Sequence, residues 1–275
     1  MQLGIFAKTF PGKTAREVLG AVKAAGFQAA QYNLACSGLP SMADEVPDAV
    51  IAEIAAAVKE SDIHLVALSA TWNIAHPDKS VRQKGLRQLR IMAPAAQALN
   101  IPLITLCTGT RDAGDQWRHH PDNTAPEAWA DMRETMAQAL SIAEQAGVSL
   151  GVEPELGNVV SSAAKAKQLL GEMKSPRLKI VLDAANLFER ESLSAQRAIV
   201  SQAAELLSGS IAMAHAKDRK PDGSFIAAGQ GVLDYPHFLN ALHGAGFDDP
   251  LVTHGLSAEE APGVAKFLSN LTQKA

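Results

Sequence analysis

Short apolar runs alternate with longer amphipathic segments along the whole chain. Short apolar runs between turn-forming residues favour strands, and apolar residues recurring every three or four positions favour helices. Strands are expected at 2–7, 28–33, 63–70, 102–107, 149–153, 178–182, 210–215 and 250–254. Helices are expected at 13–25, 47–60, 80–98, 126–147, 161–173, 194–206, 235–244 and 258–270, the first of them followed by Gly26 as a C-terminal cap. The pattern therefore predicts eight strand–helix pairs.

Strands separated by helices imply parallel connections and a sheet that is covered by helices. Eight such units in 275 residues fit a closed (β/α)8 TIM barrel better than an open, doubly wound sheet. The chain shows no linker-like stretch, repeat or shift in composition. We therefore predict an α/β protein with a single TIM-barrel domain over residues 1–275.

Three connections that follow predicted strands are longer than the others, namely 71–79, 108–125 and 216–233. In a barrel these connections lie at the carboxyl ends of the strands, where the active sites of this fold are found. This face is therefore where we expect functional residues.

Four consecutive predicted strands end in a residue that can bind a metal ion: Glu153, Asp183, His215 and His254. Adjacent strands of a barrel are about 4.8 Å apart, so their carboxyl ends can place four side chains around one ion. Two carboxylates and two imidazoles suit one divalent ion, such as Mn²⁺, Co²⁺, Zn²⁺ or Mg²⁺.

Each of these residues also has an ordinary structural interpretation. Glu153 could be a hydrogen-bonded carboxylate at a strand end, and Asp183 could cap the helical segment that follows it. His215 and His254 could be structural histidines bound to a loop. The metal interpretation depends on the coincidence of four strand ends and not on any one residue.

Charge and composition narrow the class of partner. Basic and acidic residues number 25 and 29, for a net charge of -4, and no long run of one sign occurs. This balance argues against nucleic acid or an anionic membrane as the partner and favours a small molecule. The start of the chain lacks the features of a secretory signal, no stretch is apolar enough to span a membrane, and the two cysteines form no metal-binding or disulfide pattern. We expect a cytoplasmic protein, and homo-oligomers are left open.

Several motifs together resemble a known superfamily. They are "NIAHPD" after the third strand, "GVEPELGN" at the fifth, "VLDAANLF" at the sixth, "AHAKD" at the seventh, "GQGVLDYPHFL" before the last helices and "LVTHGL" at the eighth. This set resembles the xylose isomerase-like TIM-barrel superfamily, specifically its sugar phosphate isomerase/epimerase group, over nearly the whole chain. The resemblance does not identify a substrate, and no phosphate-binding motif is visible.

The resemblance implies that Glu153, Asp183 and His215 are metal ligands and that the eighth strand provides the fourth. Many epimerases of the group have a glutamate at this fourth position, which serves as the second acid/base group, whereas this chain has His254. Asn186 stands where several relatives have a histidine. By formal charge, two carboxylates leave a divalent site about neutral, where a third would leave it at about -1.

We therefore expect a metal-dependent isomerase or epimerase that acts on a small sugar, polyol or keto-sugar through an enediolate, with Glu153 as the acid/base group. Candidate substrate contacts are Glu155, Asn73, His76, Asn186, Lys217, Arg219 and Trp72, the last by stacking on a sugar face. Asp78 is expected to cap a helix, and His119 and His120 to lie in a lid or at the surface.

Other functions remain open. A dehydratase or other lyase on a keto-polyol would use the same site, and the loss of the strand-eight glutamate weakens the case for epimerisation. An endonuclease IV-like DNA repair enzyme would need more ligands and a basic groove, which the net charge argues against. The third alternative is a barrel that binds sugar without turnover.

Overall fold

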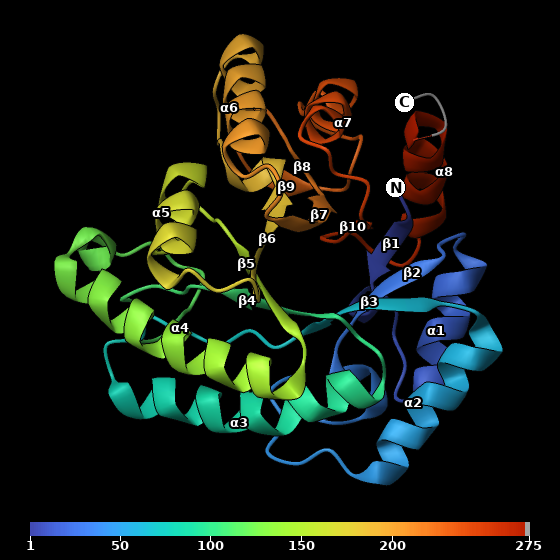
Figure 1. Cartoon of the computed structure of the whole chain (residues 1–275). Coiled ribbons are helices and arrows are strands. Elements are labelled where there is room, and N and C mark those ends of the chain that lie inside the picture. The colour runs from blue at the N-terminus through green and yellow to red at the C-terminus, as the bar shows by residue number, and fades with distance from the viewer. Residues whose placement is uncertain (273–275) are drawn as a thin grey trace.

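A computed structural model describes residues 1–272. Eight parallel strands close into a barrel in the order β1-β10-β7-β6-β5-β4-β3-β2 (Figure 1). They are β1 (Leu3–Phe6), β2 (Ala29–Tyr32), β3 (His64–Ser69), β4 (Leu103–Cys107), β5 (Ser149–Glu153), β6 (Leu178–Asp183), β7 (Ile211–Ala216) and β10 (Leu251–Thr253). The predicted TIM barrel is confirmed.

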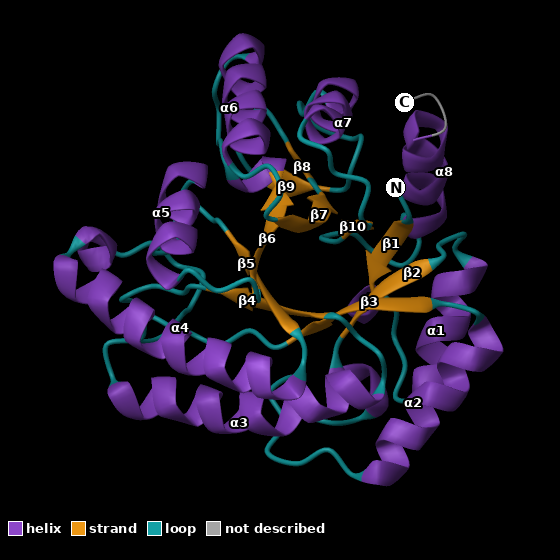
Figure 2. Cartoon of the chain, viewed as in Figure 1, coloured by secondary structure: helices purple, strands orange, loops and turns teal. Residues whose placement is uncertain are grey.

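Helices surround the barrel on the outside (Figure 2). They are α1 (Ala15–Ala24), α2 (Asp48–Ser61), α3 (Lys79–Ala98), α4 (Pro126–Ala146), α5 (Ala163–Met173), α6 (Leu193–Leu206), α7 (Tyr235–Gly244) and α8 (Ala261–Thr272). Short 3-10 helices lie at Ala7–Thr9, Leu34–Ser37, Pro121–Thr124 and Ala184–Asn186. No helix within residues 1–272 is both long enough and apolar enough to cross a membrane.

Local sequence signals define several helix ends. Thr14 and Glu17 form a capping box at the start of α1, in which each side chain accepts a hydrogen bond from the other residue's backbone N–H. Gly26 follows this helix with a φ of +95°, a conformation that glycine adopts without strain. Asp78 caps α3 as expected, because its Oδ1 accepts a hydrogen bond of 2.7 Å from Ser80 N.

The structure differs from the predicted pattern mainly near the carboxyl ends of the last strands. β10 ends at Thr253, so His254 is the first residue after the strand. The 216–233 connection also contains an antiparallel hairpin that periodicity did not predict, made of β8 (Asp218–Arg219) and β9 (Phe225–Ile226). Two residues per strand are too few to produce a recognisable alternation.

Asp218 organises this connection. Its side chain is fully buried and accepts hydrogen bonds from the backbone N–H groups of Arg219, Gly229, Gly231 and Leu233 at 2.8–3.2 Å. The glycines of the connection therefore wrap around a carboxylate of the protein itself. Gly231 is required there, because a Cβ on it would lie 2.4 Å from Asp218 Oδ1.

A small apolar layer inside the barrel supports the site. Ala67, Leu103, Val181, Met213 and Val252 form a cluster separate from the larger core between strands and helices. Gly151 belongs to the same layer, because a Cβ on it would lie 2.9 Å from Val181 Cγ2. Side chains two residues apart on a strand share one face. The next inward layer therefore contains Glu153, Asp183, His215 and His254.

Asparagine side chains fix the long connection between β4 and α4. Asn73 binds both the N–H and the carbonyl of Thr110. Asn123 accepts hydrogen bonds from Thr110 Oγ1 and Arg111 N and donates one to Gly157 O. Asn158 accepts one of 2.7 Å from Gly109 N. These bonds join the connections that follow β3, β4 and β5 into one supported surface.

Two helical glycines form a matched test of packing. Replacing a glycine inside a helix with alanine usually stabilises it by about 0.5–1 kcal/mol. Gly20→Ala in α1 should do so, because no atom lies within 4 Å of the added Cβ. Gly85→Ala in α3 should instead destabilise the protein by about 3 kcal/mol, because its Cβ would lie 2.2 Å from the Trp72 ring. Urea unfolding measures both, and a stabilising Gly85→Ala would contradict this packing.

Candidate metal centre

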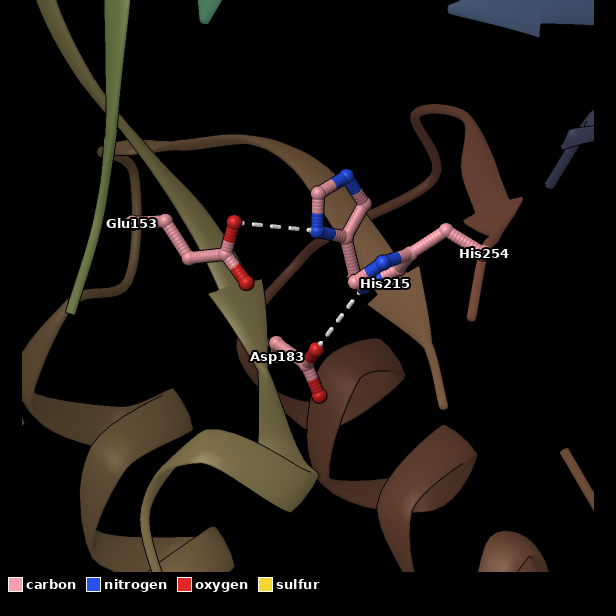
Figure 3. Close-up of side chains that lie close together, drawn as sticks. All are labelled: Glu153, Asp183, His215 and His254. Carbon is pink, nitrogen blue, oxygen red and sulfur yellow. Dashed lines mark hydrogen bonds and ion pairs between the residues drawn. The ribbon is translucent and has the colours of Figure 1, made fainter. Parts of the chain in front are cut away.

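The structure brings four strand-end side chains together. Glu153, Asp183, His215 and His254 each offer one ligand atom, and these atoms all lie within 4.8 Å of one another (Figure 3). Register explains the arrangement, because Asp183 is paired with His215 across β6 and β7, and His215 with Val252 across β7 and β10. No other such cluster occurs among residues 1–272.

The His215 ring is oriented by a residue on β2. His215 Nε2 lies 2.8 Å from Gln31 Oε1, and Gln31 Nε2 donates a hydrogen bond of 3.0 Å to Thr105 Oγ1. Because the Gln31 oxygen faces the ring, the proton belongs on Nε2 and the lone pair on Nδ1. This is the outer hydrogen bond that metal-binding histidines typically make.

His215 Nδ1 is the atom that most directly fits a bound cation. It is buried without a hydrogen-bond partner, and it lies 3.2 Å from Glu153 Oε2. A nitrogen lone pair facing a carboxylate oxygen is unfavourable unless a proton or a metal ion lies between them. The donor set therefore fits a divalent cation.

Glu153 is oriented by a hydrogen bond to one of its oxygens. Oε1 accepts a hydrogen bond of 2.7 Å from Asn186 Nδ2, which leaves Oε2 facing His215. Burial acts to raise the pKa of Glu153, but positive charge on a protonated His215 and on Lys217 outweighs burial and lowers the pKa below its usual value; a divalent cation at His215 Nδ1 would act in the same direction. The carboxylate is thus ionised and fixed in direction.

Asp183 combines the two roles considered from sequence. Its Oδ1 accepts a hydrogen bond of 2.9 Å from Ala185 N and so caps the following 3-10 helix. Its Oδ2 lies 3.2 Å from His254 Nε2 and 3.2 Å from Lys217 Nζ. Burial acts to raise the pKa of Asp183, but Lys217 and His254 together hold it well below its usual value.

His254 faces the cluster from the end of β10, as Figure 3 shows. Its ring lies 4.4 Å from the His215 ring, measured between centroids. Burial, with Lys217 and His215 nearby, lowers the pKa of His254 to about 4. The imidazole is therefore neutral at neutral pH and keeps a lone pair for a metal ion.

Lys217 adds a charge that the count of ligands omitted. Its ammonium is buried, donates a hydrogen bond of 2.8 Å to Asn186 Oδ1 and pairs with Asp183. Two carboxylates, one ammonium and a divalent ion would sum to +1, so Lys217 adds one positive charge to the neutral centre expected from the four ligands and the ion. A site with this balance favours an electron-rich oxygen in its substrate.

The cluster lies against a cavity of about 880 Å³ at the carboxyl ends of the strands. Four predicted substrate contacts line this cavity: Glu155, Asn186, Lys217 and Arg219. Burial, reinforced by Glu153, raises the pKa of Glu155 to about 9. The Arg219 guanidinium is held by the carbonyls of Ala185 and Gly223.

Three other predicted contacts do not line the cavity. The ring of Trp72 is packed against Gly85 of α3 and is 6% exposed, so it cannot stack on a sugar there. Asn73 binds Thr110, and His76 contacts Ala113 O and accepts a hydrogen bond from Asp78 N. These side chains hold loops in place, and the structure does not bring them to the cavity with the other predicted contacts.

Some cavity residues could not be selected from sequence. Gln31 lies in the middle of an apolar strand and gives no motif, and Trp117 and Phe225 stand in loops without periodicity. His119, which was expected in a lid or at the surface, lines the cavity, and His120 accepts a hydrogen bond from Asp122 N. Only the closure of the barrel brings these residues to one place.

Solved structures with the same fold include several sugar epimerases. The structure of 3-keto-D-glucoside 4-epimerase from E. coli superimposes with a TM-score of 0.76 and 16% identity over 98% of this chain and 99% of that one. D-allulose 3-epimerase from Methylomonas sp., in complex with D-allulose, gives 0.77 and 16% over 100% and 97%. An L-ribulose 3-epimerase gives 0.76 and 18% over 99% and 95%. At these identities the likeness establishes a shared fold.

Sequence comparison extends the likeness beyond shape. The chain matches none of the curated proteins with which it was compared. Residues 19–270, however, match the profile of a family described as the xylose isomerase-like TIM barrel. Because this match covers most of the chain, including all four residues of the cluster, the protein belongs to the xylose isomerase-like TIM barrel family.

Proposed function

We propose that this protein is a divalent-metal-dependent isomerase or epimerase of a small sugar or keto-sugar. The observation that carries the proposal is the unpartnered Nδ1 of His215, which faces Glu153 inside a cluster of four ligand-type side chains. Structures of the same fold that are described as epimerases of 3-keto-D-glucoside, D-allulose and L-ribulose support a sugar as the substrate class.

Glu153, Asp183, His215 and His254 would hold the ion. A divalent ion at this position supplies a Lewis acid that acidifies the proton on the carbon next to the carbonyl of a hydroxy-ketone. Glu153 would remove that proton and return it, because its carboxylate is ionised, buried and aimed into the cluster by Asn186. Return of the proton by Glu153 to the neighbouring carbon gives isomerisation, whereas epimerisation needs a second group that delivers a proton to the opposite face.

Other cavity residues would orient the substrate. The Lys217 ammonium can hydrogen-bond a substrate oxygen beside the cluster, and it is held ready by Asn186 and Asp183. Glu155 lines the same cavity two residues beyond Glu153 and is proposed to bind a sugar hydroxyl. Asn186 acts by holding both Glu153 and Lys217 in place.

A dehydratase or lyase that acts on a keto-polyol is the second candidate, and His254 is the observation that favours it. The residue after the eighth strand is a histidine that contacts Asp183, and the only carboxylate of the cluster besides Glu153 is Asp183, which already pairs with Lys217. Glu153 can remove the proton and pass it to the departing hydroxyl, which leaves as water, so a single acid/base group is enough for this reaction. An endonuclease-like role is not supported, because residues 1–272 hold a single cluster and the net charge is -4.

Metal binding can be tested without a substrate. We expect His254→Ala to weaken Mn²⁺ or Co²⁺ binding by about 100-fold, because one of four ligands is lost. Calorimetric titration of the metal-free protein measures this, and circular dichroism checks the fold. His119→Ala is the matched control, since His119 lines the cavity outside the cluster. Unchanged affinity in His254→Ala would return this residue to a structural role.

The support that Gln31 gives to His215 can be tested in the same titration. Gln31→Leu removes the acceptor for His215 Nε2–H and should weaken metal binding by about 10–100-fold. Gln31→Glu keeps an acceptor at that point and should retain most of the affinity. Equal loss in both variants would show that packing, and not the hydrogen bond, matters.

Turnover is tested by exchange with solvent. The Mn²⁺-loaded protein is incubated in D₂O with a panel of ketoses, and deuterium on sugar carbon is followed by NMR. Glu153→Gln should lower exchange by about 10³-fold or more while binding of the sugar stays measurable. Glu189→Gln is the control, because Glu189 lines the same cavity but is not one of the four residues of the cluster. Full exchange in Glu153→Gln would contradict the assigned base, and binding without exchange in the unaltered protein would point to a non-catalytic barrel.

A further inference from the structure

Two exposed aromatic rings lie on the cavity that contains the metal centre. Among residues 1–272, the large apolar side chains that are exposed include two aromatic ones, Trp117 and Phe225. Each is 49% exposed, and both line this cavity. Leaving apolar rings in water forgoes the free energy that their burial would contribute, so two such rings in the lining of one cavity indicate a ligand surface.

The backbone of Trp117 is held firmly, although its side chain is exposed. Asp115 Oδ1 accepts a hydrogen bond of 3.0 Å from Trp117 N, and Asp112 Oδ1 accepts one of 2.9 Å from Asp115 N. The Trp117 carbonyl packs so closely on Gly157 that a Cβ there would lie 2.6 Å from its oxygen. Leu156, which precedes Gly157 in the chain, lines the same cavity.

Phe225 is held from the other long connection. It pairs with Arg219 in the β8–β9 hairpin, which is built around Asp218. The centre of its ring lies 3.9 Å from Lys217 Nζ and 4.0 Å from Arg219 Cζ. Because Lys217 also contacts Asp183, only one side chain separates the Phe225 ring from the four-residue cluster.

The size of the cavity exceeds the needs of a single sugar ring. Its volume is about 880 Å³. A hexose has roughly a dozen non-hydrogen atoms, and even at about 30 Å³ each, the share of one water molecule, it would fill less than half of this space. Leu156, Trp117 and Phe225 line the same cavity, so apolar surface is available to a group that fills the remaining volume.

We propose that the substrate is a substituted keto-sugar, such as a glycoside or disaccharide, whose ring binds at the metal centre while its substituent packs on Trp117 and Phe225. This inference rests on the proposed function for the position of the reacting ring. The hydrogen bond that fixes the Trp117 backbone, and the packing of the Phe225 ring on Lys217 and Arg219, lower the entropic cost of binding the substituent. Free ketoses would use only the inner part of the cavity.

The test compares D-fructose with glucosyl-fructoses that carry glucose on O3, O4, O5 or O6, namely turanose, maltulose, leucrose and isomaltulose. Calorimetry with the Mn²⁺-loaded protein measures each affinity. We expect at least one disaccharide to bind tenfold or more tightly than D-fructose. Trp117→Ala should reduce that affinity ratio at least fivefold, and Phe225→Leu, which keeps an apolar side chain over Lys217, should reduce it in the same direction.

Leu193→Ala is the matched control, because Leu193 is also 49% exposed but lies on α6, away from the cavity lining. It should leave the ratio unchanged. The proposal is overturned if no disaccharide binds more tightly than D-fructose, or if Trp117→Ala leaves the ratio unchanged. It is also overturned if sedimentation shows that Trp117→Ala only separates two copies of the chain, since the rings would then cover a subunit interface.

Binding and exchange are read separately, so the two proposals can fail separately. A disaccharide that binds through Trp117 but takes up no deuterium would support the substituent site and contradict the isomerase. Exchange of deuterium into D-fructose, together with equal affinities for D-fructose and the disaccharides, would support the isomerase and contradict the substituent site.

Discussion

The candidate site depends on one geometric constraint, the alternation of side chains on the strands of a closed barrel. A layer of small and branched apolar residues, with Gly151 among them, fills the barrel interior and sets the height of the next inward layer. That layer consists of Glu153, Asp183, His215 and His254 on strands that are neighbours in space. Apolar packing thus places four polar side chains where their ligand atoms converge, and no long-range bond between them is needed to hold the backbone.

Charge and hydrogen bonding then decide what these side chains can do. Gln31 directs the proton of His215 away from the cluster, Asn186 directs Glu153 towards it, and burial keeps His254 neutral. The same low-dielectric surroundings would make unpaired carboxylates costly, and Lys217 offsets part of that cost, as a bound cation would. Electrostatic interactions therefore fix the protonation and orientation of these side chains, just as barrel geometry fixes their positions.

Two sets of connected loops form the walls of the cavity beside the four-residue cluster. Asparagine side chains join the connections after β3, β4 and β5, and the buried Asp218 carboxylate shapes the connection after β7. Both systems use buried polar groups whose hydrogen bonds are satisfied within the protein, which is the condition under which such groups rigidify a loop. The outcome is a wide cavity whose outer part presents Trp117 and Phe225 on fixed supports.

The sequence by itself determined the barrel and the residues of the cluster, because both follow from local patterns. Strand and helix periods differ, and the four ligand-type residues each stand at the end of a predicted strand. Tertiary structure decided the rest, since contacts between distant segments leave no local pattern. The sequence suggested that Trp72 stacks on a sugar, but in the structure its ring packs against Gly85. Gln31 belongs to a strand without a motif, and yet its side chain contacts His215. Lys217 affects the charge of the site because the end of β7 places its ammonium beside Asp183. The exposed rings of Trp117 and Phe225 line one cavity because barrel closure brings their two loops to the same face.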